Sequence, residues 1–104
     1  MATTILAKVK IDGIRAGDVV KTKFGDVRIP VGWDPGVVKG GNGIKYINPN
    51  NQRNIIRIMY PTSSPYNRPN GYITITGTDG SSKNFSGNTV LKKSAEAHFD
   101  IILN

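Results

Sequence analysis

The chain has 104 residues and a formal charge of +7, from fourteen lysines and arginines against seven acidic residues. This length suits one domain with one core, so we expect a single β domain over residues 1–104. The absence of cysteine excludes a disulfide framework, a thiolate metal site and a cysteine nucleophile. The positive charge favours a polyanion or an acidic protein surface as partner.

The first residues do not form the pattern of a signal peptide. Lys8 and Lys10 interrupt the apolar start of the chain, and no later stretch approaches the roughly 20 apolar residues of a membrane span. We therefore expect a protein with no membrane partner. Its expected location is the cytoplasm or, if a phage encodes it, the virion.

Alternating apolar and polar residues in the first half of the chain predict short strands separated by turns. Glycine, proline and aspartate mark the turns, among them a Gly-Asp turn at 25–26 and a type II turn at 35–36. Residues 32–54 are rich in turn formers, so we expect a long surface excursion there. The expected strands cover residues 5–11, 19–24, 27–31, 36–39 and 44–47.

A central strand and a hairpin are predicted next. Residues 54–60 are apolar on both faces, which is typical of a strand covered on both sides. Residues 72–85 predict a hairpin, because Asp79-Gly80 is the strongest short-range turn signal in the chain.

The end of the chain predicts a helical turn and a last strand. Residues 88–98 can make one or two helical turns with Asn88 or Thr89 as cap, and a strand is the alternative. Residues 98–103 predict the closing strand, because they are mostly apolar.

Seven or eight short strands in one small domain indicate an all-β fold. The two architectures that fit are a single antiparallel β-sandwich of the immunoglobulin or fibronectin type and a small β-barrel. Trp33 is a candidate core residue, but its glycine and proline neighbours make a position on the rim an equal alternative.

The side chains that carry enzyme chemistry are scarce. His98 is the single histidine, and it precedes an apolar strand, where a structural or surface role is the usual one. The seven acidic residues are scattered along the chain, so no metal site is expected. We predict a protein that is not an enzyme and that needs no cofactor.

Four lysines form a candidate basic face. If the first two expected strands pair as a hairpin, these lysines project opposite its apolar side and can contact phosphates. A plain alternative is that they keep an edge hairpin soluble. Base stacking would need aromatic rings among the cations, and Phe24 points the other way. The four residues are Lys8, Lys10, Lys21 and Lys23.

The loop YPTSSPYNRPNGY, residues 60–72, is a candidate docking segment. Its prolines reduce the entropy lost on ordering, and tyrosine and arginine often anchor protein interfaces. An ordinary crossover between two sheets is an equal alternative. The candidate partner-binding residues are Tyr60, Tyr66, Arg68 and Tyr72.

These observations favour a non-enzymatic structural or interaction protein that docks on a larger protein assembly. In length, turn-rich surface and lack of catalytic groups the chain resembles the small all-β decoration or auxiliary proteins of bacteriophage capsids. The resemblance implies a virion location and a major capsid protein as partner. The alternative is a nucleic-acid-binding module of the SH3-like or OB type, because GDVVKTKFGDV at 17–27 resembles the first strands of SH3-like barrels.

Overall fold

The computed structural model describes residues 2–63 and 66–102, and most of the ordered structure is β. Its strands form two antiparallel sheets, one of two strands and one of six, and these do not close into a barrel. The larger sheet has the order β3-β4-β5-β6-β7, and β8 also pairs with β6. The elements are α1 (Ala2–Asp12), β1 (Val19–Thr22), β2 (Gly25–Arg28), β3 (Asp34–Val37), β4 (Gly43–Asn48), β5 (Asn51–Met59), β6 (Tyr72–Thr76), β7 (Ser82–Lys83), the 3₁₀ helix η1 (Ala95–Ala97) and β8 (Phe99–Asp100).

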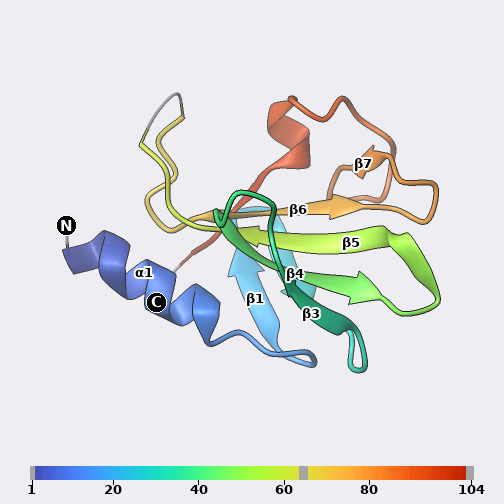
Figure 1. The fold of residues 1–104 in the computed structure, drawn as a ribbon. Coiled ribbons are helices and arrows are strands. Elements are labelled where there is room, and N and C mark those ends of the chain that lie inside the picture. The colour runs from blue at the N-terminus through green and yellow to red at the C-terminus, as the bar shows by residue number, and fades with distance from the viewer. Residues whose placement is uncertain (1, 64–65, 103–104) are drawn as a thin grey trace.

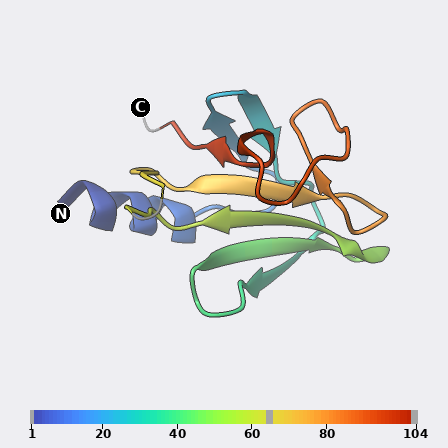
Figure 2. The ribbon, with the colours of Figure 1, turned by 90° about the horizontal axis from the view of Figure 1, so that it is seen from above.

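The β1–β2 hairpin packs on one face of the larger sheet. It lies behind β4, β5 and β6 in Figure 1, and the view from above in Figure 2 places β5 and β6 between this hairpin and the β3–β4 hairpin. In both views α1 extends beyond the end of the sheet. The predicted β-rich fold with antiparallel sheets is therefore confirmed.

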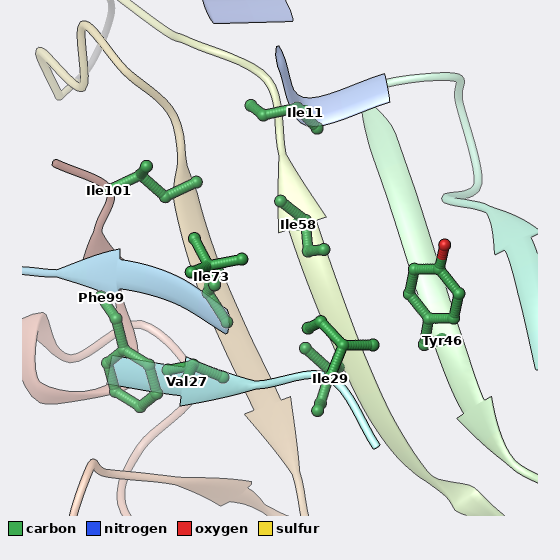
Figure 3. Close-up of a cluster of buried hydrophobic side chains, with 10 residues drawn as sticks. Ile11, Val27, Ile29, Tyr46, Ile58, Ile73, Phe99 and Ile101 are labelled. Atoms are coloured by element: carbon green, nitrogen blue, oxygen red, sulfur yellow. The ribbon is translucent and has the colours of Figure 1, made fainter. Parts of the chain in front are cut away.

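The core fills the space between the hairpin and the sheet (Figure 3). Ile58 of β5 and Ile73 of β6 have no exposed surface and meet side chains of the hairpin and of β8. The Tyr46 hydroxyl donates a hydrogen bond of 2.8 Å to the Ile14 carbonyl, which satisfies the polar end of a buried ring. The core residues are Ile11, Val20, Val27, Ile29, Tyr46, Ile56, Ile58, Ile73, Phe99 and Ile101.

Two predictions about the second half of the chain are confirmed. The strand expected at 54–60 lies within β5, which pairs with β4 on one side and β6 on the other. The hairpin around Asp79-Gly80 joins β6 to β7, and Gly80 adopts the positive φ that such a turn needs.

The strand predicted at 5–11 is wrong, because this segment belongs to α1. Ala7 and Ile11 are the buried residues, and their spacing of four places both on one side of a helix. Ile5 and Val9, which a strand would place on the same face as Ala7 and Ile11, are exposed. Positions 7 and 11 lie on one face of a strand and also on one face of a helix. The apolar alternation therefore did not distinguish the two, and the segment was assigned to the wrong element.

The two turns predicted at 25–26 and 35–36 are misplaced. Gly25 pairs with Thr22, so the β1–β2 turn is formed by the two residues before Gly25, and the 25–26 dipeptide lies in β2. The Thr22 hydroxyl closes this turn by donating a 2.7 Å hydrogen bond to the Gly25 carbonyl. Pro35 lies in β3, an edge strand, where a residue without an N–H is tolerated.

The expected excursion over 32–54 instead supplies β3, β4 and the start of β5. The short strands expected at 36–39 and 44–47 are present, with shifted ends. Trp33 is half-buried and packs against the edge of the core, which agrees with the rim alternative.

The segment after β7 differs in detail from its prediction. A single 3₁₀ turn forms late in the segment, with Ser94 rather than Asn88 or Thr89 at its N-cap. The last strand is the two-residue β8, followed by a bridge between Ile101 and Thr22. The end of the predicted strand at residue 103 lies outside the described residues.

Gly71 and Gly32 form a matched pair for testing the fold. Both have positive φ, but a Cβ at Gly71 would overlap the Met59 carbonyl oxygen and come within 2.8 Å of Ile11 Cδ1, whereas one at Gly32 meets nothing within 4 Å. We expect Gly32→Ala to cost about 1–2 kcal/mol of unfolding free energy. Gly71→Ala should cost about 1–3 kcal/mol more. Urea unfolding measures both, and equal losses would contradict the packing at Gly71.

Candidate functional site

One face of the larger sheet is hollowed into a cleft of about 940 Å³. Side chains of β4, β5 and β6 line it together with the β3–β4 turn, residue 66 and the segment 92–98. Five lysine and arginine side chains and one histidine border the hollow, and no carboxylate of the described residues does. We call this hollow the basic cleft. Its basic side chains are Lys39, Lys45, Arg57, Lys92, Lys93 and His98.

The strand register decides which side chains form the floor of the basic cleft. Ile58 and Ile73 are direct partners across β5 and β6, and both face the core. Because neighbouring residues of a strand point to opposite faces, the next row faces away from the core. That row consists of Lys45, Arg57 and Thr74, which are cross-strand partners on β4, β5 and β6.

The floor of the basic cleft carries uncompensated positive charge. Lys45 stands directly opposite Arg57, and like charges in this position destabilise a sheet. The ion pairs found among the described residues involve Asp79 and Asp100, and neither acid pairs with a cation that lines the cleft. The cleft therefore presents a positive potential to solvent.

A row of planar side chains in contact connects the loop 60–72 with the rim of the cleft. The Arg68 guanidinium carbon lies 5.6 Å from the centre of the Tyr66 ring and 5.0 Å from that of Tyr72. The Tyr72 ring in turn lies 5.2 Å from the imidazole of His98. Tyr66, Arg68 and Tyr72, three of the four predicted loop residues, are thus brought together. Tyr66, Tyr72 and His98 also line the basic cleft.

Arg68 holds the loop from inside. Its guanidinium forms an ion pair with the half-buried Asp100 carboxylate of β8. Its backbone pairs with Thr62 through hydrogen bonds of 2.8 and 3.1 Å. The Arg68 charge is therefore satisfied within the chain, whereas Tyr66 is 64% exposed and open to a partner.

Tyr60, the fourth predicted loop residue, lies apart from this row. Its hydroxyl donates a hydrogen bond to the Asp12 carboxylate, and the Lys8 ammonium lies 4.9 Å from the centre of its ring. These contacts tie the end of β5 to the end of α1. The hydrogen bond to Asp12, with smaller contributions from desolvation and the negative charge, raises the pKa of the Tyr60 phenol above 10.0.

The predicted lysine face is not formed, because α1 replaces the first strand of the expected hairpin. Lys8 lies over Tyr60 instead, and Lys23 approaches Asp100 to 3.7 Å. Lys10 and Lys21 still border one smaller hollow of about 280 Å³ between α1 and β1, lined otherwise by aliphatic residues.

The cations of the basic cleft were not predicted as a site from the sequence. Lys45 and Arg57 lie in two expected strands, and their positions between apolar residues indicate that each side chain points away from the apolar face of its strand. Combining them required knowing that these strands are neighbours and in which register they pair. Lys39, Lys92 and Lys93 come from connecting segments, for which alternation offers no guide.

Other functional signals are sparse. Within the described residues no three histidine or acidic side chains gather where they could hold a metal ion. No helix of that part of the chain has the length and apolar character needed to cross a membrane. No protein-family model matches the chain, and neither curated proteins nor solved structures show significant similarity to it. The basic cleft is therefore the strongest basis for a functional proposal.

The contact between Tyr60 and Asp12 predicts a defined pH dependence. We expect Asp12→Asn to lower the pKa of Tyr60 toward 10.0, because the variant loses the carboxylate acceptor and its charge. A pKa raised in the folded state stabilises the protein below the unfolded pKa, and this stability is lost as pH rises through the folded pKa. The stability gap between the wild type and Asp12→Asn should therefore narrow above about pH 10.

An NMR titration of the tyrosine rings measures the pKa directly. Tyr60→Phe identifies the signal, because only that resonance disappears. An identical Tyr60 pKa in the wild type and in Asp12→Asn would contradict the hydrogen bond.

Proposed function

We propose that the chain is a non-enzymatic binding domain that holds an extended anionic partner in the basic cleft. The observation that carries this proposal is the convergence of five lysine and arginine side chains, without an ion-pair partner among the described residues, on one hollowed sheet face. A bound anion would also relieve the repulsion between Lys45 and Arg57.

The distribution of the cations favours a chain-like partner. They come from three separate segments that line the cleft: the β3–β4 turn at Lys39, the sheet floor, and Lys92 and Lys93 after β7. A linear polyanion brings successive charges to cations on separate segments, and each contact releases a condensed counterion. Binding of this kind weakens steeply with salt.

Docking on a larger protein assembly is a second candidate, and α1 carries it. Ile5, Leu6 and Val9 are 66%, 54% and 61% exposed on the part of the chain that extends beyond the sheet (Figures 1 and 2). Lys10 and Lys21 border the adjoining aliphatic hollow. An apolar surface with a basic rim fits a protein surface with an apolar centre and acidic rim. The expected partner is a shell component such as a major capsid protein, which would place the chain in the virion.

The finer assignments of fold are separate from this proposal. An immunoglobulin- or fibronectin-like sandwich, and an SH3-like or OB-type module for nucleic-acid binding, stay predictions. The basic cleft needs only the register of β4, β5 and β6 and the segments around it.

The double substitution Lys45→Gln and Arg57→Gln tests the cleft. We expect it to weaken binding of long-chain inorganic polyphosphate and to reduce the slope of log K against log salt by about 1 for each cation removed. The fold should persist, because the exchange removes a repulsive pair from the solvent-facing side. Calorimetry at several salt concentrations measures affinity and slope.

Lys10→Gln with Lys21→Gln is the matched control, since it removes the same charge from the other hollow. This control should keep most of the affinity and slope. Equal losses in the two double variants would show that net charge alone drives binding, and would contradict a specific cleft.

The docking candidate is tested by co-sedimentation with purified shell particles from the native source. We expect Ile5→Gln with Val9→Gln to abolish co-sedimentation at physiological salt, because it removes the apolar centre of the α1 surface. Val31→Gln with Leu91→Gln is the control, because Val31 and Leu91 are each 81% exposed but lie outside α1. This control should leave co-sedimentation unchanged. Failure of the wild-type chain to sediment with the particles would rule this candidate out.

A further inference from the structure

Tyr66 offers a flat apolar surface at the rim of the basic cleft. The side chain is 64% exposed, although it belongs to the residues that line the hollow. Burial of an aromatic ring is favourable, so a ring kept open beside a row of cations is suited to a partner with its own planar group. The Tyr72 and His98 rings, which lie 5.2 Å apart, also line the cleft, and the Arg68 guanidinium contacts both Tyr66 and Tyr72.

Contacts within the loop hold Tyr66 in place before any partner binds. The Arg68 guanidinium lies within cation–π distance of both Tyr66 and Tyr72, and its ion pair with Asp100 fixes that guanidinium to β8. The Thr62 hydroxyl donates a 2.8 Å hydrogen bond to the Tyr66 carbonyl. A ring ordered in advance loses little further entropy when a partner stacks on it.

We propose that the partner of the basic cleft is a single-stranded nucleic acid, with its phosphates on the cleft cations and a base stacked on Tyr66. This inference rests on the proposed function and adds the class of polyanion. Lys45 and Arg57 lie on the floor of the same hollow whose rim holds Tyr66. A single strand carries a negative phosphate and a planar base in every nucleotide. The phosphates match the cations of the cleft, and a base matches the aromatic ring.

Other anionic partners use only part of this arrangement. Polyphosphate has no planar group for the ring, and an acidic peptide presents carboxylates without an obligatory planar neighbour. In a duplex the bases are stacked on one another, so their faces are closed to Tyr66, whereas single strands can splay them out. A single strand is the polyanion that engages both the cations and the ring.

The experiment compares Tyr66→Ala with Tyr66→Phe, in fluorescence anisotropy with labelled oligothymidylate and oligouridylate of about 12 nucleotides. We expect Tyr66→Ala to weaken binding of at least one oligonucleotide by about 5- to 150-fold, the loss typical of one stacked base. Tyr66→Phe should stay close to the wild type, because it keeps the ring. Neither variant should change polyphosphate affinity. Tyr66 is exposed, so both variants should fold, and thermal unfolding checks this.

The outcomes separate this inference from the proposed function. If Lys45→Gln with Arg57→Gln weakens polyphosphate and oligonucleotide binding while Tyr66→Ala changes neither, the stacking inference is overturned and the anion-binding proposal stands. Tighter binding of a duplex than of either single strand also overturns the inference. If the wild type binds neither polyphosphate nor any oligonucleotide at low salt, both proposals fail.

Discussion

The register of β4, β5 and β6 is the constraint on which the core and the basic cleft both depend. In this register Ile58 and Ile73 are buried, and Lys45 and Arg57 point to the opposite face. A slip of one residue would expose the isoleucines and turn Arg57 toward the core. Burying an unpaired guanidinium is costly in free energy. The burial of the isoleucines and the exposure of the charged side chains therefore favour the same register of β4, β5 and β6.

The charged face has a cost that the fold itself does not explain. The β1–β2 hairpin covers one side of the sheet, and Lys45 beside Arg57 would oppose the packing of an apolar layer on the other. Their mutual repulsion weakens the unbound protein. An anionic partner removes that repulsion, so the unfavourable pair makes physical sense as part of a binding site. The apolar surface of α1 lies on a different element, and substitutions can therefore separate the two candidate interfaces.

The loop 60–72 contains a residue that stabilises the fold, Arg68, and a residue that is exposed to solvent, Tyr66. Arg68 joins the loop to β8 through Asp100 and lies within cation–π distance of two tyrosine rings, so its charge serves the fold. Tyr66, held by these contacts, keeps most of its surface exposed. The docking hypothesis from the sequence treated both residues as contacts for a partner. The structure shows that one residue positions the other.

The sequence by itself determined the β-rich class, the central strand at 54–60 and the Asp79-Gly80 hairpin, because alternation and turn chemistry act between close neighbours in the chain. Only the tertiary structure decided that residues 2–12 form a helix, since positions 7 and 11 suit both periodicities and packing chooses between them. The basic cleft is likewise a tertiary feature. Its cations are separated by up to 54 positions, from Lys39 to Lys93, and they meet only because strand order and register bring them to one face.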